Sequence, residues 1–242
     1  MSIGSDRHVA ISIPARPWPV TVLPAATALV CIDLQHDFCS PGGWDAAAGL
    51  DVTACAAVVP VVARLLAAAR RAGLTVVHTR EGHLPDLSDC REWKLERSRR
   101  AGAAIGSEGP LGRFLVRGEP GHAIVEPVAP LPDELVIDKP GKDAFLSTRL
   151  ADELGDREVS HLLVAGVTTE CCVSSTIRTA NDLGYRCVLI EDACASPVPQ
   201  YHDAAVELVA EIFGCVTTSD AVVSALSEIR LGSTEPSPAM ES

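Results

Sequence analysis

The chain has 242 residues, of which 47% are hydrophobic and only 4% aromatic. This length suits one α/β domain, and a core of small aliphatic side chains suits a parallel sheet covered by helices. The formal net charge of −12 argues against binding to nucleic acids or anionic membranes, which are themselves negatively charged. The one basic cluster, Arg97, Arg99 and Arg100, is short, lies near acidic residues and is typical of a solvated helix face or a subunit contact.

The composition also bears on the cellular compartment. No basic end followed by an apolar run opens the chain, so no secretory signal is expected, and no uninterrupted apolar window of about 18 residues predicts a membrane span. The nine cysteines include no CxxC pair and favour reduced thiols in the cytosol. We expect residues 1–24 to form an N-terminal extension, residues 25–231 one domain, and residues 232–242 a disordered tail.

Strand and helix patterns alternate along the chain. Short apolar runs predict strands, and helical apolar periodicity or flanking signals predict the helices between them. In chain order we expect a strand over residues 27–33, a helix over 58–71, a strand over 74–79, a long irregular stretch over 80–133, a strand over 134–139, a helix over 146–154, a strand over 161–166, a helix over 170–183, a strand over 185–191, a helix over 199–213, a strand over 214–217 and a helix over 219–230. The alternation predicts an open, mostly parallel six-stranded sheet with helices on both faces, in which ligands bind at the carboxyl ends of the strands.

Three reactive side chains fall at such carboxyl ends. Asp33 ends the first predicted strand, Lys139 ends the third, and Cys172 lies just past the fourth, in the first turn of a helix. A carboxylate, an ammonium group and a thiol are sufficient for nucleophilic acyl transfer: Asp33 would take the thiol proton, and Lys139 would favour the thiolate. Free backbone N–H groups in that helical turn would stabilise an oxyanion. Each residue alone is more typical of a cap, a turn or a packing position than of a catalytic role. The coincidence of the three at strand ends makes the two interpretations equally favoured, so the pattern leaves both open.

Two adjacent cysteines compete for the role of nucleophile. Cys171 continues into a polar helix face with Ser175 and Arg178, whereas Cys172 lies between that face and the apolar stripe. The spacing favours Cys172 only weakly. A redox pair of the two is disfavoured, because adjacent cysteines form strained disulfides.

These motifs resemble those of the isochorismatase-like cysteine hydrolases. The resemblance covers about residues 25–230, and its carriers are VCIDLQ (residues 30–35) before Asp37-Phe38, VIDK (136–139) before Ala144-Phe145, and GVTTECCV (166–173). Matching the motifs places the family's catalytic Asp, Lys and Cys on Asp33, Lys139 and Cys172. The family also has a cis peptide before the residue that matches Thr168, which implies an oxyanion hole formed by the N–H groups of Thr168 and Cys172.

Within this family, the long irregular stretch looks closest to the biuret hydrolases. The carriers are HTREGH (78–83), PDL (85–87), RGEPG (117–121), DKPGK (138–142) and AND (180–182) before Gly184-Tyr185. The resemblance implies a small, planar urea or carbamoyl substrate that loses ammonia through a Cys172 thioester, without a metal or other cofactor. The implied substrate-binding residues are Phe38, Lys139, Thr169, Glu81 and Arg80.

One departure leaves the substrate open. Biuret hydrolases carry a glutamine before the residues that match Phe213-Gly214, and residues 208–212 of this chain contain none. Alternatives with the same mechanism are hydrolysis of triuret or of a ureido acid such as ureidoacrylate or N-carbamoylsarcosine, with Arg80 as a candidate for binding the carboxylate. Isochorismate hydrolysis is a more distant alternative, and so is a non-catalytic binding or assembly role on this fold.

Histidines in the long stretch raise the question of a metal. His78, His83 and Asp86 lie where the nicotinamidase branch binds a divalent metal, but they lack its ligand spacing, so we predict no metal site. The sequence assigns no role to His36, His83 or His122. The resemblance further implies a homo-oligomer, a dimer or a tetramer.

Overall fold

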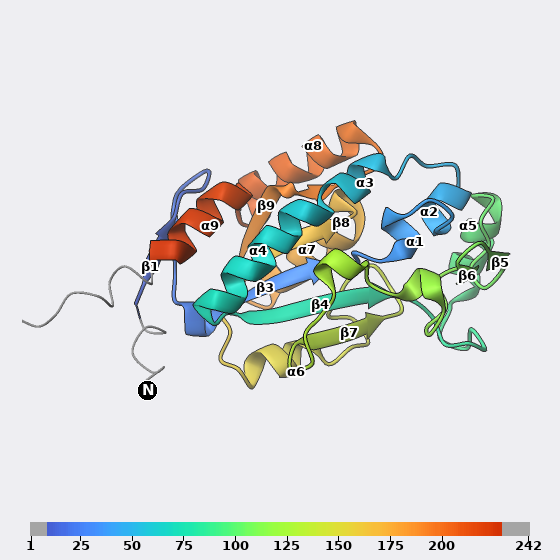
Figure 1. The fold of residues 1–242 in the computed structure, drawn as a ribbon, viewed down its shortest axis with the longest axis horizontal. Helices are drawn as coiled ribbons and strands as arrows, with labels where there is room; N and C mark the ends of the chain where they lie inside the picture. Colours follow the sequence, from blue (N-terminus) through green and yellow to red (C-terminus); the bar gives the residue numbers. More distant parts are fainter. Residues whose placement is uncertain (1–8, 229–242) are drawn as a thin grey trace, which may run out of the picture.

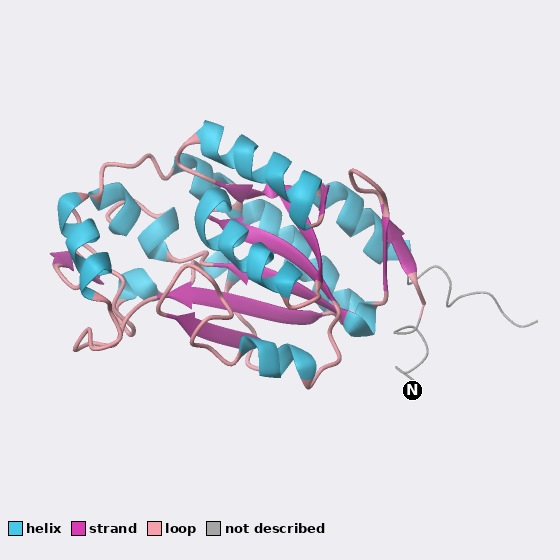
Figure 2. Cartoon of the chain, turned by 180° about the vertical axis from the view of Figure 1, so that it is seen from behind, coloured by secondary structure: helices cyan, strands magenta, loops and turns pink. Residues whose placement is uncertain are grey.

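The computed structural model describes residues 9–228 and is built around a six-stranded sheet. All strand pairs in the sheet are parallel, in the order β10-β9-β8-β3-β4-β7, and helices cover both faces (Figures 1 and 2). The strands are β3 (Thr27–Ile32), β4 (Thr75–Glu81), β7 (Leu135–Lys139), β8 (His161–Val167), β9 (Arg186–Ala195) and β10 (Cys215–Thr217). The predicted fold class is therefore confirmed.

The helices form a layer on each face of the sheet. On one face lie α4 (Val59–Ala72) and α9 (Ser219–Glu228), and on the other lie α6 (Leu150–Gly155) and α7 (Ser174–Asp182). The remaining helices are α1 (His36–Cys39), α2 (Trp44–Ala47) and α3 (Thr53–Ala57) after β3, α5 (Glu92–Arg100) after β4, and α8 (Pro199–Leu208) after β9. The two layers enclose separate hydrophobic cores, because successive residues of each buried strand point to opposite faces.

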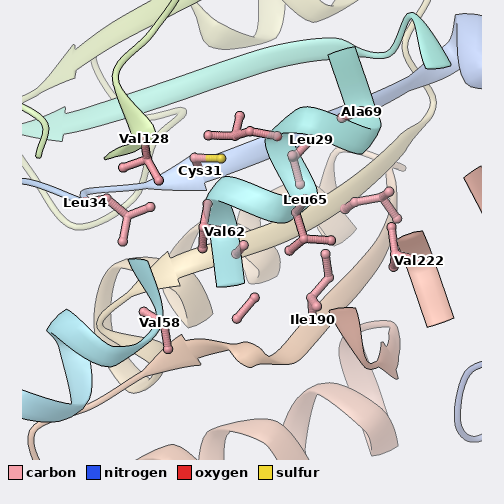
Figure 3. Close-up of a cluster of buried hydrophobic side chains, with 14 of the residues drawn as sticks. Leu29, Cys31, Leu34, Val58, Val62, Leu65, Ala69, Val128, Ile190 and Val222 are labelled. Carbon is pink, nitrogen blue, oxygen red and sulfur yellow. The ribbon is translucent and has the colours of Figure 1, made fainter. Parts of the chain in front are cut away.

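Helix α4 explains the most apolar stretch of the chain. Its Val62, Leu65 and Leu66 are completely buried, and Figure 3 shows side chains of this helix packed against those of β3 and β9. Gly73 then ends the helix at φ 72°, the left-handed conformation expected of a C-terminal cap. By length and composition Thr53–Ala72 would suffice to cross a membrane, but burial of the α4 stripe against the sheet accounts for its apolar residues.

The stretch that the sequence left irregular contains more secondary structure than expected. Strand β4 continues to Glu81, α5 covers residues 92–100, and β5 (Glu108–Gly109) forms a small antiparallel hairpin with β6 (Gly112–Arg113). Two 3-10 turns follow at Pro120–His122 and Glu126–Val128. Helix α5 escaped prediction because it is mostly charged and buries only Ser98 fully, so it has no apolar stripe.

The N-terminal extension belongs to the folded body. Strands β1 (Ile11–Ile13) and β2 (Val20–Val22) pair as an antiparallel hairpin. Between them, Arg16 and Val216 exchange two backbone hydrogen bonds, of 2.9 and 2.8 Å, at the edge of β10. At the other end α9 is described as far as Glu228, and the predicted continuation to residue 230 and the predicted tail over 232–242 lie outside the described residues.

Candidate active site

The carboxyl ends of β3, β4 and β7 meet in a buried cluster. The ammonium group of Lys139 lies 2.7 Å from Asp33 Oδ2, and the hydroxyl of Thr79 donates a 2.6 Å hydrogen bond to Asp33 Oδ1. Lys139 also donates to the Gly141 carbonyl at 2.9 Å, and all three side chains of the cluster are fully buried. Both carboxylate oxygens of Asp33 therefore have fixed partners, which orient this side chain without any ligand.

Glu81, the last residue of β4, is surrounded by three lysine side chains. Its carboxylate lies 2.7 Å from the ammonium group of Lys94, 3.0 Å from that of Lys142 and 3.6 Å from that of Lys139. Burial raises the pKa of Glu81, but the three lysines outweigh it and hold that pKa well below its usual value. Glu81 points into the site because strand residues two apart share a face, and Thr79 is already there.

Cys172 reaches the same cluster from the turn after β8. Residues Thr169–Val173 form a π-helical segment, where an ordinary α-helical turn was expected, and α7 begins at Ser174. The thiol donates a hydrogen bond to Glu81 Oε2 at 3.3 Å. One carboxylate oxygen of Asp33, one of Glu81 and the sulfur of Cys172 lie within 4.8 Å of one another. The structure thus brings together the carboxylate, ammonium and thiol groups that the sequence singled out.

The two adjacent cysteines differ in exposure and acidity. Cys172 is 3% exposed, and a hydrogen bond with Cys171 together with burial raises the pKa of its thiol well above the usual value. The charge of Lys139 lowers that pKa but does not prevail, so the expected stabilisation of a resting thiolate is not found. Cys171 is partly exposed, and the hydrogen bond with Cys172, helped by the charge of Lys142, lowers its pKa to about 7.

Lys139 remains an ammonium group in this environment. Burial is the largest influence and lowers the pKa of Lys139, but the negative charges of Asp33, Cys172 and Glu81 together raise it above its usual value. A lysine that keeps its proton serves as a fixed positive charge and a hydrogen-bond donor. It does not serve as a base.

Backbone conformation around the cluster is unusual at two positions. Asp33 has φ 48°, in the left-handed region that few residues other than glycine adopt. Gly166 in β8 has φ 120°, and a Cβ at this position would lie 2.1 Å from the Ile32 carbonyl oxygen. The absent side chain lets β8 approach β3 just before Asp33. Strained residues cluster at functional sites, so the conformation of Asp33 agrees with a role in one.

The peptide between Val167 and Thr168 is cis, as the family resemblance implied. The Thr168 N–H has no hydrogen-bond acceptor among residues 9–228, and Thr168 and Cys172 line the same pocket. These observations support the expected oxyanion hole, whose function remains a prediction.

A pocket of about 270 Å³ opens beside Cys172. Phe38 and Trp44 form one side of it, with their rings edge to face and their centroids 6.3 Å apart. Lys142 also lines this pocket, and its ammonium group lies 5.8 Å from the centre of the Trp44 ring. A second pocket of about 260 Å³ shares Trp44, Lys142 and Arg97 with the first, so space continues beyond the Trp44 ring.

The other predicted substrate-binding residues are placed differently. Thr169 is fully buried and its hydroxyl bonds to the ring of His202 at 2.8 Å. The guanidinium group of Arg80 forms two hydrogen bonds with Asp138, of 2.7 and 3.0 Å. Arg80 lies on the face of β4 opposite Glu81, because neighbouring strand residues alternate, and it does not line the pocket. The structure therefore does not place Arg80 where it would bind a substrate carboxylate.

Several residues at the site were missed by sequence reasoning. Lys142 was passed over because motif matching had already assigned Lys139, and Trp44 and Asp45 lie in the short helix α2 after β3, where no pattern marks them. Lys94 comes from α5, a helix that was not expected. Only Lys142 had a usable signal, since it lies three residues after the end of β7.

The residues do not fit a resident divalent metal. Asp33, Glu81 and Cys172 have suitable spacing, but lysine ammonium groups already contact both carboxylates and would repel a second cation. The histidines have separate partners: His78 bonds to Glu134, His83 to Asp89 and His36 to Ser40, and His122 lies 3.5 Å from Asp138.

Comparison with known proteins gives a consistent result. The family model for the isochorismatase domain matches residues 27–221. The ureidoacrylate amidohydrolase RutB of Azorhizobium caulinodans is 32% identical over 213 residues, which are 85% of this chain and 92% of the relative. The RutB of Methylobacterium radiotolerans is also 32% identical, over 92% of this chain and 88% of the relative.

Solved structures show the same relationship. A cysteine hydrolase from Pseudomonas syringae pv. phaseolicola is 26% identical with a TM-score of 0.75, covering 89% of this chain and 98% of the other. N-carbamoylsarcosine amidase from Thermoplasma acidophilum has the same fold at 23% identity, with a TM-score of 0.61 over 80% of this chain and 96% of the other. The resemblance read from the three sequence motifs is confirmed, and the chain belongs to the isochorismatase family.

Proposed function

We propose that this protein is a cysteine amidohydrolase that cleaves a C–N bond of a small linear urea or carbamoyl compound and releases ammonia. The observation that carries the proposal is the position of the Cys172 thiol, which lines a pocket and lies within 4.8 Å of the Asp33 carboxylate. Lys139 and Thr79 hold that carboxylate in place. This arrangement supplies a nucleophile and a base that is already oriented.

The first half of the reaction forms a thioester. Cys172 Sγ attacks the substrate carbonyl carbon while the thiol proton passes to Asp33, which the raised pKa of the thiol requires. The oxyanion accepts hydrogen bonds from the N–H groups of Thr168 and Cys172, each worth about 2.7–4 kcal/mol of barrier. The tetrahedral intermediate then collapses: the C–N bond breaks, Asp33 returns its proton to the leaving nitrogen, and ammonia departs.

The second half releases the acid. A water molecule gives a proton to Asp33 and attacks the thioester carbonyl, the C–S bond breaks, and the proton returns to the Cys172 sulfur. Glu81, to which the resting thiol bonds, is a poor base for both steps. The three ammonium groups around Glu81 lower its pKa and therefore its basicity.

Two classes of substrate are candidates. A biuret-like urea is our leading candidate, because the pocket of about 270 Å³ is small and Lys142 in its wall can donate to a second carbonyl. A ureido acid is the second candidate, which the names of the ureidoacrylate amidohydrolases among the relatives support. Arg97 also favours it, since this guanidinium lines the pocket and has no ion pair within residues 9–228.

An ammonia-release screen tests the proposal. Wild-type protein is assayed on biuret, triuret, ureidoacrylate and N-carbamoylsarcosine, with Cys172→Ala as the blank and Cys215→Ala, a cysteine in β10 away from the pocket, as the matched control. We expect at least one substrate to be cleaved, with a loss of about 10⁴-fold or more in kcat for Cys172→Ala alone. Full activity of Cys172→Ala on the best substrate would refute the assignment of the nucleophile.

A cytosolic homo-oligomer is part of the same proposal. All nine cysteines are free in the structure, which suits a reducing compartment. The oligomeric state rests on family resemblance alone, and light scattering of the purified protein would determine it.

A further inference from the structure

The substrate pocket contains two carboxylates that the mechanism does not use. Asp45, in α2, and Glu170, in the π-helical segment, both line it. Asp45 is only 3% exposed. Oxygen Oδ2 of Asp45 and oxygen Oε2 of Glu170 are buried, and neither accepts a hydrogen bond from any residue in the described part of the chain.

Neither carboxylate forms an ion pair with a residue in the range 9–228. Lys142 donates hydrogen bonds of 3.0 and 3.1 Å to the two oxygens of Glu81, and Arg97 lies on an exposed helix at the pocket's edge. Burial raises the pKa of Asp45 to about 7 against the opposing charge of Lys142, while Glu81, Cys171 and Glu170 raise it further. A buried acceptor left without a donor is destabilising, and a ligand that carries donors into the pocket would remove this destabilisation.

The chemistry of such a ligand follows from the charges. Both side chains offer oxygens that accept hydrogen bonds from N–H groups, and in their ionised forms they repel a substrate carboxylate. The exposed charge of Arg97 is screened by solvent and offsets this only in part. We infer that Asp45 and Glu170 form a receptor for N–H groups at the end of the substrate far from the scissile bond, so that the site prefers a neutral urea with a second amide over a ureido acid.

This inference rests on the proposed function and narrows it to one substrate class. In a biuret-type molecule the attacked carbonyl lies at the Cys172 thiol. The second amide then offers a carbonyl to Lys142, which has one N–H left beyond its two bonds to Glu81, and an NH₂ group to Asp45 and Glu170. A ureido acid of similar length would bring its carboxylate toward the same two acceptors.

The test compares kcat/KM for biuret and for 3-ureidoacrylate in wild type, Asp45→Asn, Asp45→Leu and Glu170→Gln. The matched control is Asp182→Asn, at the exposed end of α7. We expect wild type to prefer biuret, and each pocket variant to lose about tenfold or more on biuret, the usual value of one charge-assisted hydrogen bond. On 3-ureidoacrylate the same variants keep or gain activity, and Asp182→Asn leaves both substrates unchanged.

A binding measurement separates this inference from the proposed function. Calorimetric Kd values for biuret and 3-ureidoacrylate are measured in the Cys172→Ala background, with and without Asp45→Asn and Glu170→Gln, after circular dichroism has shown that each variant is folded. Tighter binding of biuret that weakens about tenfold in the double variants supports the receptor even if turnover fails. Equal effects on both ligands, or a wild-type preference for 3-ureidoacrylate, would overturn it.

Discussion

The buried carboxylate of Asp45 makes a specific prediction about stability and pH. In the unfolded chain its pKa has the ordinary value of 3.8, and in the folded protein burial raises that pKa to about 7. Between these two pH values the folded protein keeps a proton that the unfolded chain has lost. Because of this carboxylate, the unfolding free energy of the protein falls as the pH rises from about 4 to about 7. Above about pH 7 the loss is constant.

The size of this loss follows from the two pKa values. Each pH unit between 3.8 and about 7 contributes about 1.4 kcal/mol, so the full loss is at most about 4 kcal/mol. Asp45→Asn removes the titration but leaves an amide N–H₂ group that costs roughly 1–3 kcal/mol unless it finds an acceptor. We therefore expect the variant to be less stable than wild type near pH 4 and more stable, by about 1–3 kcal/mol, near pH 8.

The difference between the two ends of the pH range is the decisive quantity. Urea unfolding of wild type and Asp45→Asn at several values between about pH 4 and about pH 8 measures it, with Asp182→Asn as the exposed control, for which we expect no trend. A stability difference between Asp45→Asn and wild type that stays constant within about 0.5 kcal/mol across this range would refute the reasoning. It would show that Asp45 is solvated or paired in the folded protein.

Three further predictions concern the neighbouring residues. Iodoacetamide at neutral pH should alkylate Cys171 faster than Cys172, because Cys171 is more exposed and its pKa is about 7, and peptide mass spectrometry would show the reverse order if Cys172 were a preformed thiolate. Glu81→Gln should lower the unfolding free energy by about 1–3 kcal/mol in urea titrations, since it removes the carboxylate partner of the partly exposed Lys94 and Lys142, and an unchanged unfolding free energy would contradict this. Gly166→Ala should unfold the protein at a clearly lower temperature, because its Cβ would lie 2.1 Å from the Ile32 oxygen, and an unchanged melting temperature would count against the close approach.

Much of the fold could be predicted because its signals are local. Each central strand is an apolar run of a few residues, and the alternation with helices implies parallel pairing. The carboxyl-end rule then selected Asp33, Lys139 and Cys172, and the structure brings these three together. Family motifs chose between Cys171 and Cys172, where helix spacing was nearly neutral, and the greater burial of Cys172 agrees with that choice.

Other elements were not predictable for identifiable reasons. Helix α5 has no apolar stripe, so its Lys94 was invisible as a partner of Glu81. The hairpin of β1 and β2 has only three residues in each strand, too few for alternation to stand out. Arg80 was offered as a substrate contact, and the pairing of β4 with β7 sets it against Asp138 instead.

The sequence by itself determined the layered α/β architecture and singled out Asp33, Lys139 and Cys172, because both depend on patterns within short segments. Only the tertiary structure decided which charged side chains of the site are paired. Glu81 is surrounded by Lys94, Lys139 and Lys142, whereas Asp45 has no ion-pair partner within residues 9–228, although Glu81 and Asp45 are both buried carboxylates. Charge interactions depend on distance and burial, and these are fixed only when segments remote in the chain pack together.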